Sequence, residues 1–204
     1  MNSKERLLDI SYRHKLSHLG SCLTALPIIE EIYAKKQPGD RFVLSAGHAH
    51  LAHLVVMEQQ GLLNAEENLE KYGIHCDRQA GCDASTGSLG LGLPIAVGMA
   101  LGQKDVDVYC LVTDGECMEG SIYEALEIAH KLNLHNLKIY VNMNGMSAYD
   151  FIDIPHLKKR LSAFNLDIQF RETDAHLGIW ATGLAQHYKT ADEELLKQER
   201  NDKS

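Results

Sequence analysis

Residues 112–147 read V-T-D-G-E-C-M-E-G-S-I-Y-E-A-L-E-I-A-H-K-L-N-L-H-N-L-K-I-Y-V-N-M-N-G-M-S. An apolar run from Val108 to Val112 leads into this stretch, and a second apolar run, from Leu137 to Val141, lies near its end. Both runs are typical of buried parallel strands. Between them, apolar residues recur at the spacing of one helix face: Ile122, Leu126, Ile128, Ala129 and Leu132. The stretch therefore predicts a strand-helix-strand unit with two parallel strands.

A polar side chain follows each of these two strands. Asp114 offers a carboxylate oxygen and Asn144 an amide oxygen, and two neighbouring parallel strands bring them to the same edge of a sheet. Magnesium prefers such oxygen ligands and shares them with substrate phosphates, and Gly115 lets the backbone approach a phosphate closely. The unit thus suits a Mg²⁺-diphosphate group. The alternative is a strand-helix-strand unit without a ligand site, in which Asp114 only caps the helix.

Length and composition bound the class of protein. The chain has 204 residues and a net charge of −8, which argues against non-specific binding to nucleic acid or to anionic membranes. Its five cysteines form an odd set without a C-x-x-C pair, so we expect reduced thiols in a cytoplasmic protein, and neither a disulfide framework nor a zinc site. The N-terminal residues lack the apolar core of a signal peptide.

The rest of the chain predicts one α/β domain, a mostly parallel sheet flanked by helices, over residues 1–196, with a disordered tail over 197–204. Asn64 and Glu67 form a capping-box pattern ahead of one helix. The further predicted elements are helices over 3–15, 26–35, 50–60, 65–72 and 94–101, and strands over 41–45 and 166–171.

Five segments, in order, carry a family resemblance. They are S-H-L-G-S (17–21), L-S-A-G-H-A (44–49), G-I-H-C (73–76), T-G-S-L-G-L-G (86–92), and the run D-G-E-C-M-E-G-S-I-Y-E-A with its closing N-M-N (114–144). Together they resemble the transketolases, enzymes that depend on thiamine diphosphate. The third segment matches less closely than the others, and Thr113 stands where the family motif begins with glycine. The resemblance implies the thiamine diphosphate-binding fold of the diphosphate-binding type.

The resemblance also implies which residues hold the cofactor. Asp114, Asn144 and the backbone carbonyl of Met146 would bind Mg²⁺ or Ca²⁺, and Gly115 would touch the diphosphate. The backbone at Gly87 and at Leu89 would meet the aminopyrimidine ring. Glu119 and Glu124 would lie near a subunit interface and the cofactor.

Four histidines become candidate catalytic residues on the same grounds. His18, His48 and His75 would face the reacting sugar, and His48 would also reach a phosphate of the cofactor. His187 lies in a segment, A-Q-H-Y-K-T-A-D-E-E, that resembles a family stretch with a substrate-facing histidine. For His18 and His187 the alternative is a surface histidine in a loop. A metal site at His50 and His53 is not favoured, because their spacing differs from H-E-x-x-H.

The chain resembles only one half of a thiamine enzyme. We expect the N-terminal, diphosphate-binding subunit of a split transketolase, which pairs with a C-terminal subunit, as α2β2, to move a two-carbon ketol group between sugar phosphates. The partner would bring the pyrimidine-binding domain and most contacts to the substrate phosphate. The alternatives are a non-catalytic scaffold protein with this fold and a subunit of the deoxyxylulose-phosphate synthase type.

Overall fold

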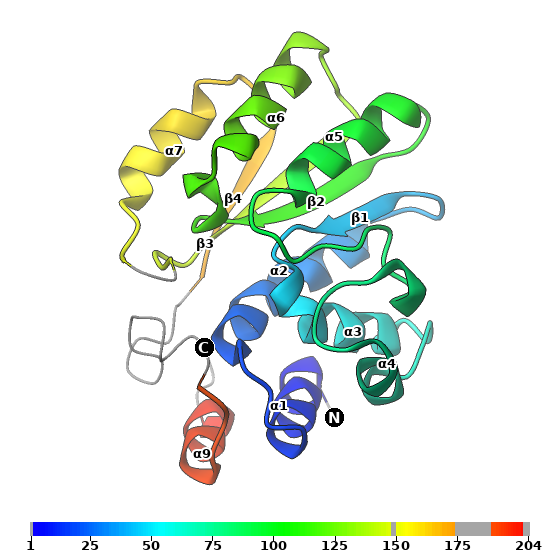
Figure 1. Cartoon of the computed structure of the whole chain (residues 1–204), viewed down its shortest axis with the longest axis vertical. Coiled ribbons are helices and arrows are strands. Elements are labelled where there is room, and N and C mark those ends of the chain that lie inside the picture. The colour runs from blue at the N-terminus through cyan, green and yellow to red at the C-terminus, as the bar shows by residue number, and fades with distance from the viewer. Residues whose placement is uncertain (1, 148–149, 174–188, 202–204) are drawn as a thin grey trace.

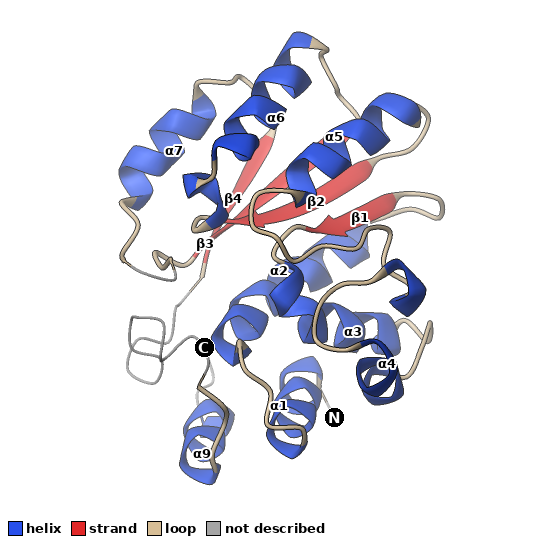
Figure 2. Ribbon diagram, in the orientation of Figure 1, coloured by secondary structure: helices blue, strands red, loops and turns tan. Residues whose placement is uncertain are grey.

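A sheet of four parallel strands forms the centre of the molecule, in the order β1-β2-β3-β4. The computed structural model describes residues 2–147, 150–173 and 189–201. The strands are β1 (Arg41–Leu44), β2 (Val108–Thr113), β3 (Leu137–Met143) and β4 (Ile168–Glu172). Helices lie on both faces of the sheet (Figures 1 and 2), so the predicted α/β fold is confirmed.

Each face of the sheet has its own layer of helices, as Figure 1 shows. One layer is made of α5 (Gly92–Gly102), α6 (Gly120–Lys131) and α7 (Ile154–Ser162). The other contains α1 (Ser3–Arg13), α2 (Leu19–Lys35), α3 (His50–Gln59), α4 (Ala65–Tyr72) and α9 (Glu193–Asn201). Three short 3-10 helices, η1 (Gly47–Ala49), η2 (Arg78–Ala80) and η3 (Glu116–Met118), lie in the connecting loops. Among the described helices, none is both long enough and apolar enough to cross a bilayer.

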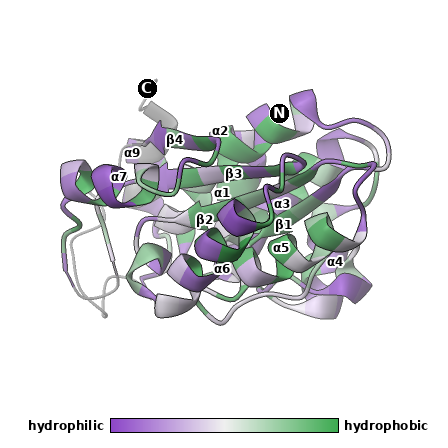
Figure 3. Ribbon diagram, turned by 90° about the horizontal axis from the view of Figure 1, so that it is seen from above, coloured by the Kyte–Doolittle hydropathy of each residue, from purple (hydrophilic) through white to green (hydrophobic). Residues whose placement is uncertain are grey.

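Successive strand residues pack into two different hydrophobic cores. Phe42 and Leu44 of β1 face the core formed with α1 to α4, whereas Val43 between them faces the core formed with α5 to α7. Because side chains alternate along a strand, a strand covered on both faces is apolar throughout. Figure 3 shows this as green central strands between helices with purple outer parts. Fully burying each large side chain stabilises the fold by roughly 1.5–3 kcal/mol.

Two helix boundaries differ from the sequence predictions by more than two residues. Helix α2 begins at Leu19, seven residues before the predicted start, because burial of Leu19, Cys22 and Leu23 outweighs the weak helix signal of Gly20. Helix α9 continues to Asn201, through positions predicted to form a disordered tail. Leu196 of α9 is buried in the core beside α1, and this packing favours the helix.

The predicted cap of α4 is present. The side chain of Asn64 accepts hydrogen bonds from the backbone N–H groups of Glu66 and Glu67. The full reciprocal capping box occurs instead at α1, between Asn2 and Glu5. Capping of this kind satisfies N–H groups that have no partner within the helix.

Candidate functional site

The carboxyl edge of the sheet carries the polar residues predicted from the sequence. Thr113 at the end of β2 is in register with Asn142 of β3, and the N–H of Asp114 donates to the Asn142 carbonyl at 2.9 Å. Asp114, directly after β2, therefore lies beside the turn over residues 144–147, which follows β3. The parallel register, rather than closeness in sequence, brings the two segments together.

The three predicted metal ligands lie on these two adjoining turns. The Asp114 carboxylate accepts hydrogen bonds from the N–H of Gly115, at 2.9 Å, and of Gly145, at 2.6 Å. Asn144 Oδ1 accepts from the N–H of Met146 at 2.9 Å. A Cβ atom added at Gly115 would lie 3.3 Å from the carbonyl oxygen of Met146. A carboxylate, an amide oxygen and a backbone carbonyl thus lie on two adjoining turns, and a hard divalent cation takes donors of these kinds.

Burial changes the acidity of Asp114. Its side chain is fully buried, and desolvation raises the pKa to about 6, although hydrogen bonds from Gly145 and Gly115 act in the opposite direction. A buried carboxylate without a nearby counter-charge is costly, and a bound divalent cation removes that cost. The buried acid therefore fits the proposed cation.

The raised pKa makes a prediction for the cofactor-free chain. Between about pH 4 and pH 6 the folded chain keeps a proton on Asp114 that the unfolded chain, with an ordinary pKa of 3.8, has released. Asp114 therefore lowers the free energy of unfolding as pH rises through this window, by at most about 3 kcal/mol, since one pKa unit is about 1.4 kcal/mol. Urea unfolding of the wild type and of Asp114→Ala, both in chelator, should show the wild type losing stability relative to the variant between pH 4.5 and pH 7. A relative stability that stays constant or moves the other way would contradict the raised pKa.

The predicted histidines lie along the loops beside this edge. The rings of His18 and His48 are 5.0 Å apart between centroids. His18 is buried and precedes α2 in a left-handed backbone conformation, with φ 63°. His75 is exposed, and a Cβ added at Gly87 would come within 3.0 Å of its ring. His18 and His48 therefore form one pair, His75 and Gly87 another, and His187 lies outside the described residues.

A close backbone contact joins the histidine segments. A Cβ added at Gly47 would lie 2.2 Å from the carbonyl oxygen of Thr86, so only glycine fits next to His48 at this contact. The Thr86 hydroxyl also donates to the carbonyl of Leu44 at 2.6 Å. The turn after β1 is thus locked against the glycine-rich segment 86–92.

The glycine-rich segment then reaches the start of α6. A Cβ added at Gly90 would come within 2.7 Å of the Cβ of Glu119, and Ser121 Oγ donates to the Gly90 carbonyl at 2.9 Å. Glu119, the residue before α6, is exposed, as is Leu89. Two candidate cofactor residues, Gly87 and Leu89, therefore lie on a segment that contacts the third, Glu119.

Glu116 connects several segments of the site by hydrogen bonds, and the sequence analysis did not identify this role. Its fully buried carboxylate accepts from Ser45 Oγ at 2.6 Å, from Gly90 N–H at 3.1 Å and from Thr113 N–H at 3.1 Å. Burial raises its pKa, and these donors counteract that effect. The residue ties the ends of β1 and β2 to the glycine-rich segment. Its position directly after Asp114-Gly115 is a signal in the sequence, but its partners are known only from the fold.

The departure at Thr113 is compatible with this arrangement. Thr113 Oγ1 accepts from the N–H of Glu116 at 3.2 Å and so stabilises the turn that carries Asp114. Asn142, which is in register with Thr113, donates to Thr24 Oγ1 at 2.9 Å and accepts from Thr173 Oγ1 at 2.5 Å. The side chains of Thr113 and Asn142 thus both stabilise the carboxyl edge of the sheet through hydrogen bonds.

A parallel α/β sheet with polar side chains and tightly packed glycines at its carboxyl edge is typical of domains that bind phosphate groups. Residues 9–187 match the family described as transketolase, thiamine diphosphate binding domain. The chain belongs to this family.

Named relatives agree with this assignment. The chain is 30% identical over 191 residues to one subunit of the apulose-4-phosphate transketolase of Phocaeicola vulgatus, a match that covers 81% of this chain and 68% of the relative. It is 36% identical over 173 residues to human transketolase, covering 72% of this chain and 28% of the relative. The chain thus spans about a quarter of the human protein.

Solved structures agree with the fold. A transketolase variant from Pichia stipitis superimposes with a TM-score of 0.79 at 22% identity, covering 97% of this chain and 39% of that chain. Transketolase from Campylobacter jejuni gives a TM-score of 0.74 at 21% identity, covering 98% and 43%.

Proposed function

We propose that this chain is the diphosphate-binding subunit of a two-chain transketolase that transfers a two-carbon ketol group between sugar phosphates. The observation that supports the proposal is the contact between the two turns that carry Asp114, Asn144 and Met146 at the carboxyl edge of the sheet. These groups would hold Mg²⁺ or Ca²⁺, and the cation would hold the diphosphate. Bound thiamine diphosphate supplies an electron sink for breaking a carbon–carbon bond next to a carbonyl.

The chain's own residues would then bind and orient the reactants. Gly115 leaves room for the diphosphate, and the backbone at Gly87 and at Leu89 meets the aminopyrimidine. The His18 and His48 pair orients substrate hydroxyls and carries protons, which suits imidazole near neutral pH. His75, exposed beside Gly87, closes the same side of the site. His187, which lies outside the described residues, is also proposed to contact the substrate.

A second polypeptide would supply the pyrimidine-binding side of the site. The relative from Phocaeicola vulgatus is itself named as a single subunit of its transketolase, and this chain covers 68% of its length. We assign the complementary part to a C-terminal transketolase chain and the assembly to α2β2. The five free cysteines motivate a cytoplasmic location.

An exposed apolar surface around α5 and α6 is the proposed contact with that partner. The glycine-rich segment lies directly against the start of α6, and α5 packs against α6. Both helices and the loops that lead into them carry exposed apolar side chains, which are typical of an interaction surface. These residues are Leu89, Leu91, Ile95, Met118 and Ile128, with exposed fractions of 37–50%. Gly98 and Gly120 lie on the same helices with open space around their Cα atoms, which allows another backbone to approach.

A charge within this surface should weaken the assembly. Ile95→Asp should cost about 2 kcal/mol or more of association free energy, a roughly 30-fold loss of affinity, because a carboxylate would be buried against apolar groups. Leu62→Asp, at an apolar residue that is 65% exposed in the loop after α3, is the matched control and should leave affinity unchanged. Calorimetric titration with the partner chain measures both. Equal affinity of the two variants would place the interface elsewhere.

Complementation of two purified chains tests the proposed function. This chain is mixed with the candidate C-terminal subunit, and transfer of a two-carbon unit from a ketose phosphate to an aldose phosphate is followed with and without thiamine diphosphate and Mg²⁺. Cofactor-dependent transfer should require both chains. Full activity of this chain alone would refute the split enzyme, and no transfer by an assembled pair would favour the scaffold alternative. The relatives from Phocaeicola vulgatus and human are transketolases, so the deoxyxylulose-phosphate synthase type is not favoured.

A further inference from the structure

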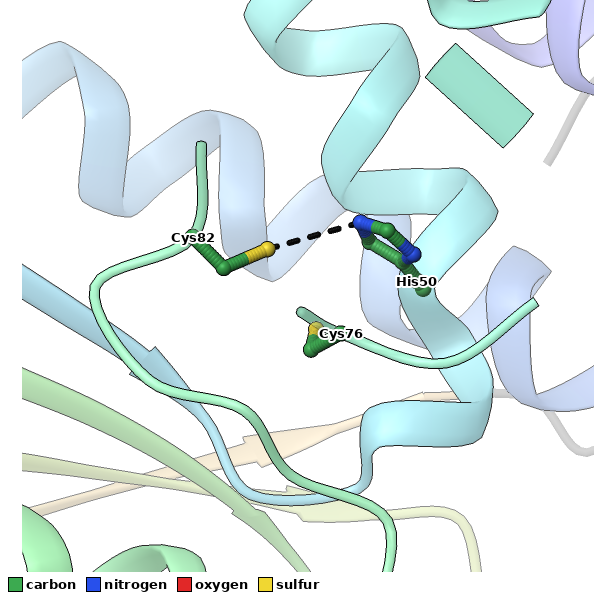
Figure 4. Close-up of side chains that lie close together, drawn as sticks. All are labelled: His50, Cys76 and Cys82. Atoms are coloured by element: carbon green, nitrogen blue, oxygen red, sulfur yellow. Dashed lines mark hydrogen bonds between the residues drawn. The ribbon is translucent and has the colours of Figure 1, made fainter. Parts of the chain in front are cut away.

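Two histidines and two cysteines meet inside the core, away from the carboxyl edge. His50 and His53 lie on α3, and Cys76 and Cys82 lie on the loop that contains η2. One ligand atom from each of His50, Cys76 and Cys82 lies within 4.8 Å of the others (Figure 4). The four side chains are at most 6% exposed. Two separate segments thus bring His50, Cys76 and Cys82 within mutual reach of one ion, with His53 beside Cys82.

The distances around Cys82 are those of a tetrahedral zinc site. With Zn–S of about 2.3 Å and Zn–N of about 2.0 Å, a sulfur and a nitrogen ligand lie about 3.5 Å apart. Cys82 Sγ lies 3.4 Å from His50 Nε2 and 3.6 Å from His53 Nδ1. In Figure 4 the sulfur atoms of Cys82 and Cys76 and the ring of His50 surround a common centre.

The surroundings of His53 support a ligand role. Its Nε2 lies 2.7 Å from the Tyr33 hydroxyl, so this nitrogen can carry the proton while Nδ1 keeps a lone pair toward the cluster. Metal-binding histidines are commonly held in this way by a hydrogen bond from the second ring nitrogen.

A simple packed cluster explains these residues less well. The cluster lies within the apolar core of α1 to α4, where the Cys82 thiol, a weak hydrogen-bonding group, is the partner of both His50 Nε2 and His53 Nδ1. Buried polar groups of this kind are costly unless they are paired or coordinate a metal. Two thiolates and two neutral imidazoles around Zn²⁺ form a set without net charge, which suits an apolar core. The Cys₂His₂ set favours zinc over Mg²⁺ or Ca²⁺, which take oxygen.

We propose that His50, Cys76 and Cys82 bind one structural zinc ion and that His53, whose Nδ1 lies 3.6 Å from Cys82 Sγ, turns toward them as the fourth ligand. Backbone hydrogen bonds connect this site to the segments of the candidate active site. The N–H of Cys76 donates to the Gly47 carbonyl at 3.2 Å, and the Cys76 carbonyl accepts from Thr86 N–H at 3.1 Å. Zinc at Cys76 would therefore fix the segments that carry His48, His75 and Gly87. The proposal does not depend on thiamine diphosphate.

No such signal is present in the sequence, for a physical reason. The cysteines are spaced C-x₅-C and the histidines H-x₂-H, outside the usual spacing of zinc motifs. The contact between α3 and the loop that contains η2 creates the set, and only the fold shows this contact. The expectation of reduced thiols without a zinc site is therefore replaced by this proposal.

Metal content of the full chain tests the site. The protein is expressed in zinc-supplemented medium without a polyhistidine tag and measured by plasma mass spectrometry. We expect one zinc ion per wild-type chain, its loss in Cys76→Ser and Cys82→Ser, and its retention in Cys110→Ser. Cys110 is a matched control, because its thiol is equally buried but lies in the other core. Chelation of the zinc should lower Tm by about 5–10 °C.

Cobalt substitution keeps the test decisive if the variants fail to fold. Wild-type chain loaded with Co²⁺ should show intense visible bands of tetrahedral cobalt and an ultraviolet thiolate-to-cobalt band. A zinc-free wild type with all thiols free would overturn the proposal, as would a Cys76–Cys82 disulfide seen by intact mass. Bound zinc whose removal leaves Tm unchanged would overturn the structural role.

Discussion

Replacement of Asp114 with alanine should reduce the affinity of the assembled enzyme for thiamine diphosphate and Mg²⁺ at least 100-fold. Asp114 is the one carboxylate among the three proposed ligands, and its loss removes the charge that attracts the cation. Removing even an outer-shell partner of a metal ligand costs about 10–100-fold, and Asp114 would bind the metal directly. The diphosphate is held through the metal, so both affinities should fall together.

Calorimetric titration of the two-chain assembly with thiamine diphosphate and Mg²⁺ measures this effect. Asp105→Ala is the matched control, because Asp105 is exposed in the loop before β2, at the opposite edge of the sheet. Circular dichroism and association with the partner should be unchanged in both variants. An Asp114→Ala assembly that binds the cofactor as tightly as the wild type would remove Asp114 from the metal site.

The Gly92→Ala substitution should destabilise the chain by about 3 kcal/mol. A Cβ at this position would lie 2.4 Å from the Cα of Ser45 and 2.5 Å from its Cβ. Overpacking of a well-packed core costs about 1–3 kcal/mol, and here the obstructing atoms include backbone that cannot turn aside. Displacement of Ser45 would also break its hydrogen bond to Glu116. We therefore expect a cost at the upper end of the range.

Gly98→Ala provides the matched control on the same helix, since nothing lies within 4 Å of its added Cβ. Alanine is the better helix former, so this change should stabilise the isolated chain by about 0.5–1 kcal/mol. Urea unfolding of both variants measures the two effects, which have opposite signs. Equal stability of Gly92→Ala and the wild type would contradict the packing described for β1 and α5.

The regular part of the fold was predictable because it depends on local pattern. Apolar runs predict β2 and β3, and helical spacing predicts α6, as the structure confirms. The start of α2 was not predictable in this way. Gly20 and Pro27 lower the local helix propensity, and the burial that overrides it comes from residues distant in sequence.

The candidate site was likewise predictable only where it depends on local sequence. The shared position of Asp114, Gly115 and Asn144 at one edge of the sheet was predictable, because the parallel register of two strands follows from one strand-helix-strand unit. The role of Glu116 was not identifiable, because Ser45 and Gly90 reach it from other segments. The meeting of α3 with Cys76 and Cys82 was hidden for the same reason.

The backbone at His18 has a consequence for protein engineering. A side chain in the left-handed conformation costs roughly 1–2 kcal/mol relative to glycine, which adopts it freely. A turn that served the fold alone would be more stable with glycine at this position. Histidine here is therefore a compromise in which stability is given up to keep an imidazole beside His48. If His18 orients substrate as proposed, programmes that raise thermostability by relieving backbone strain should leave it unchanged, because the relaxed variant would be more stable and less active.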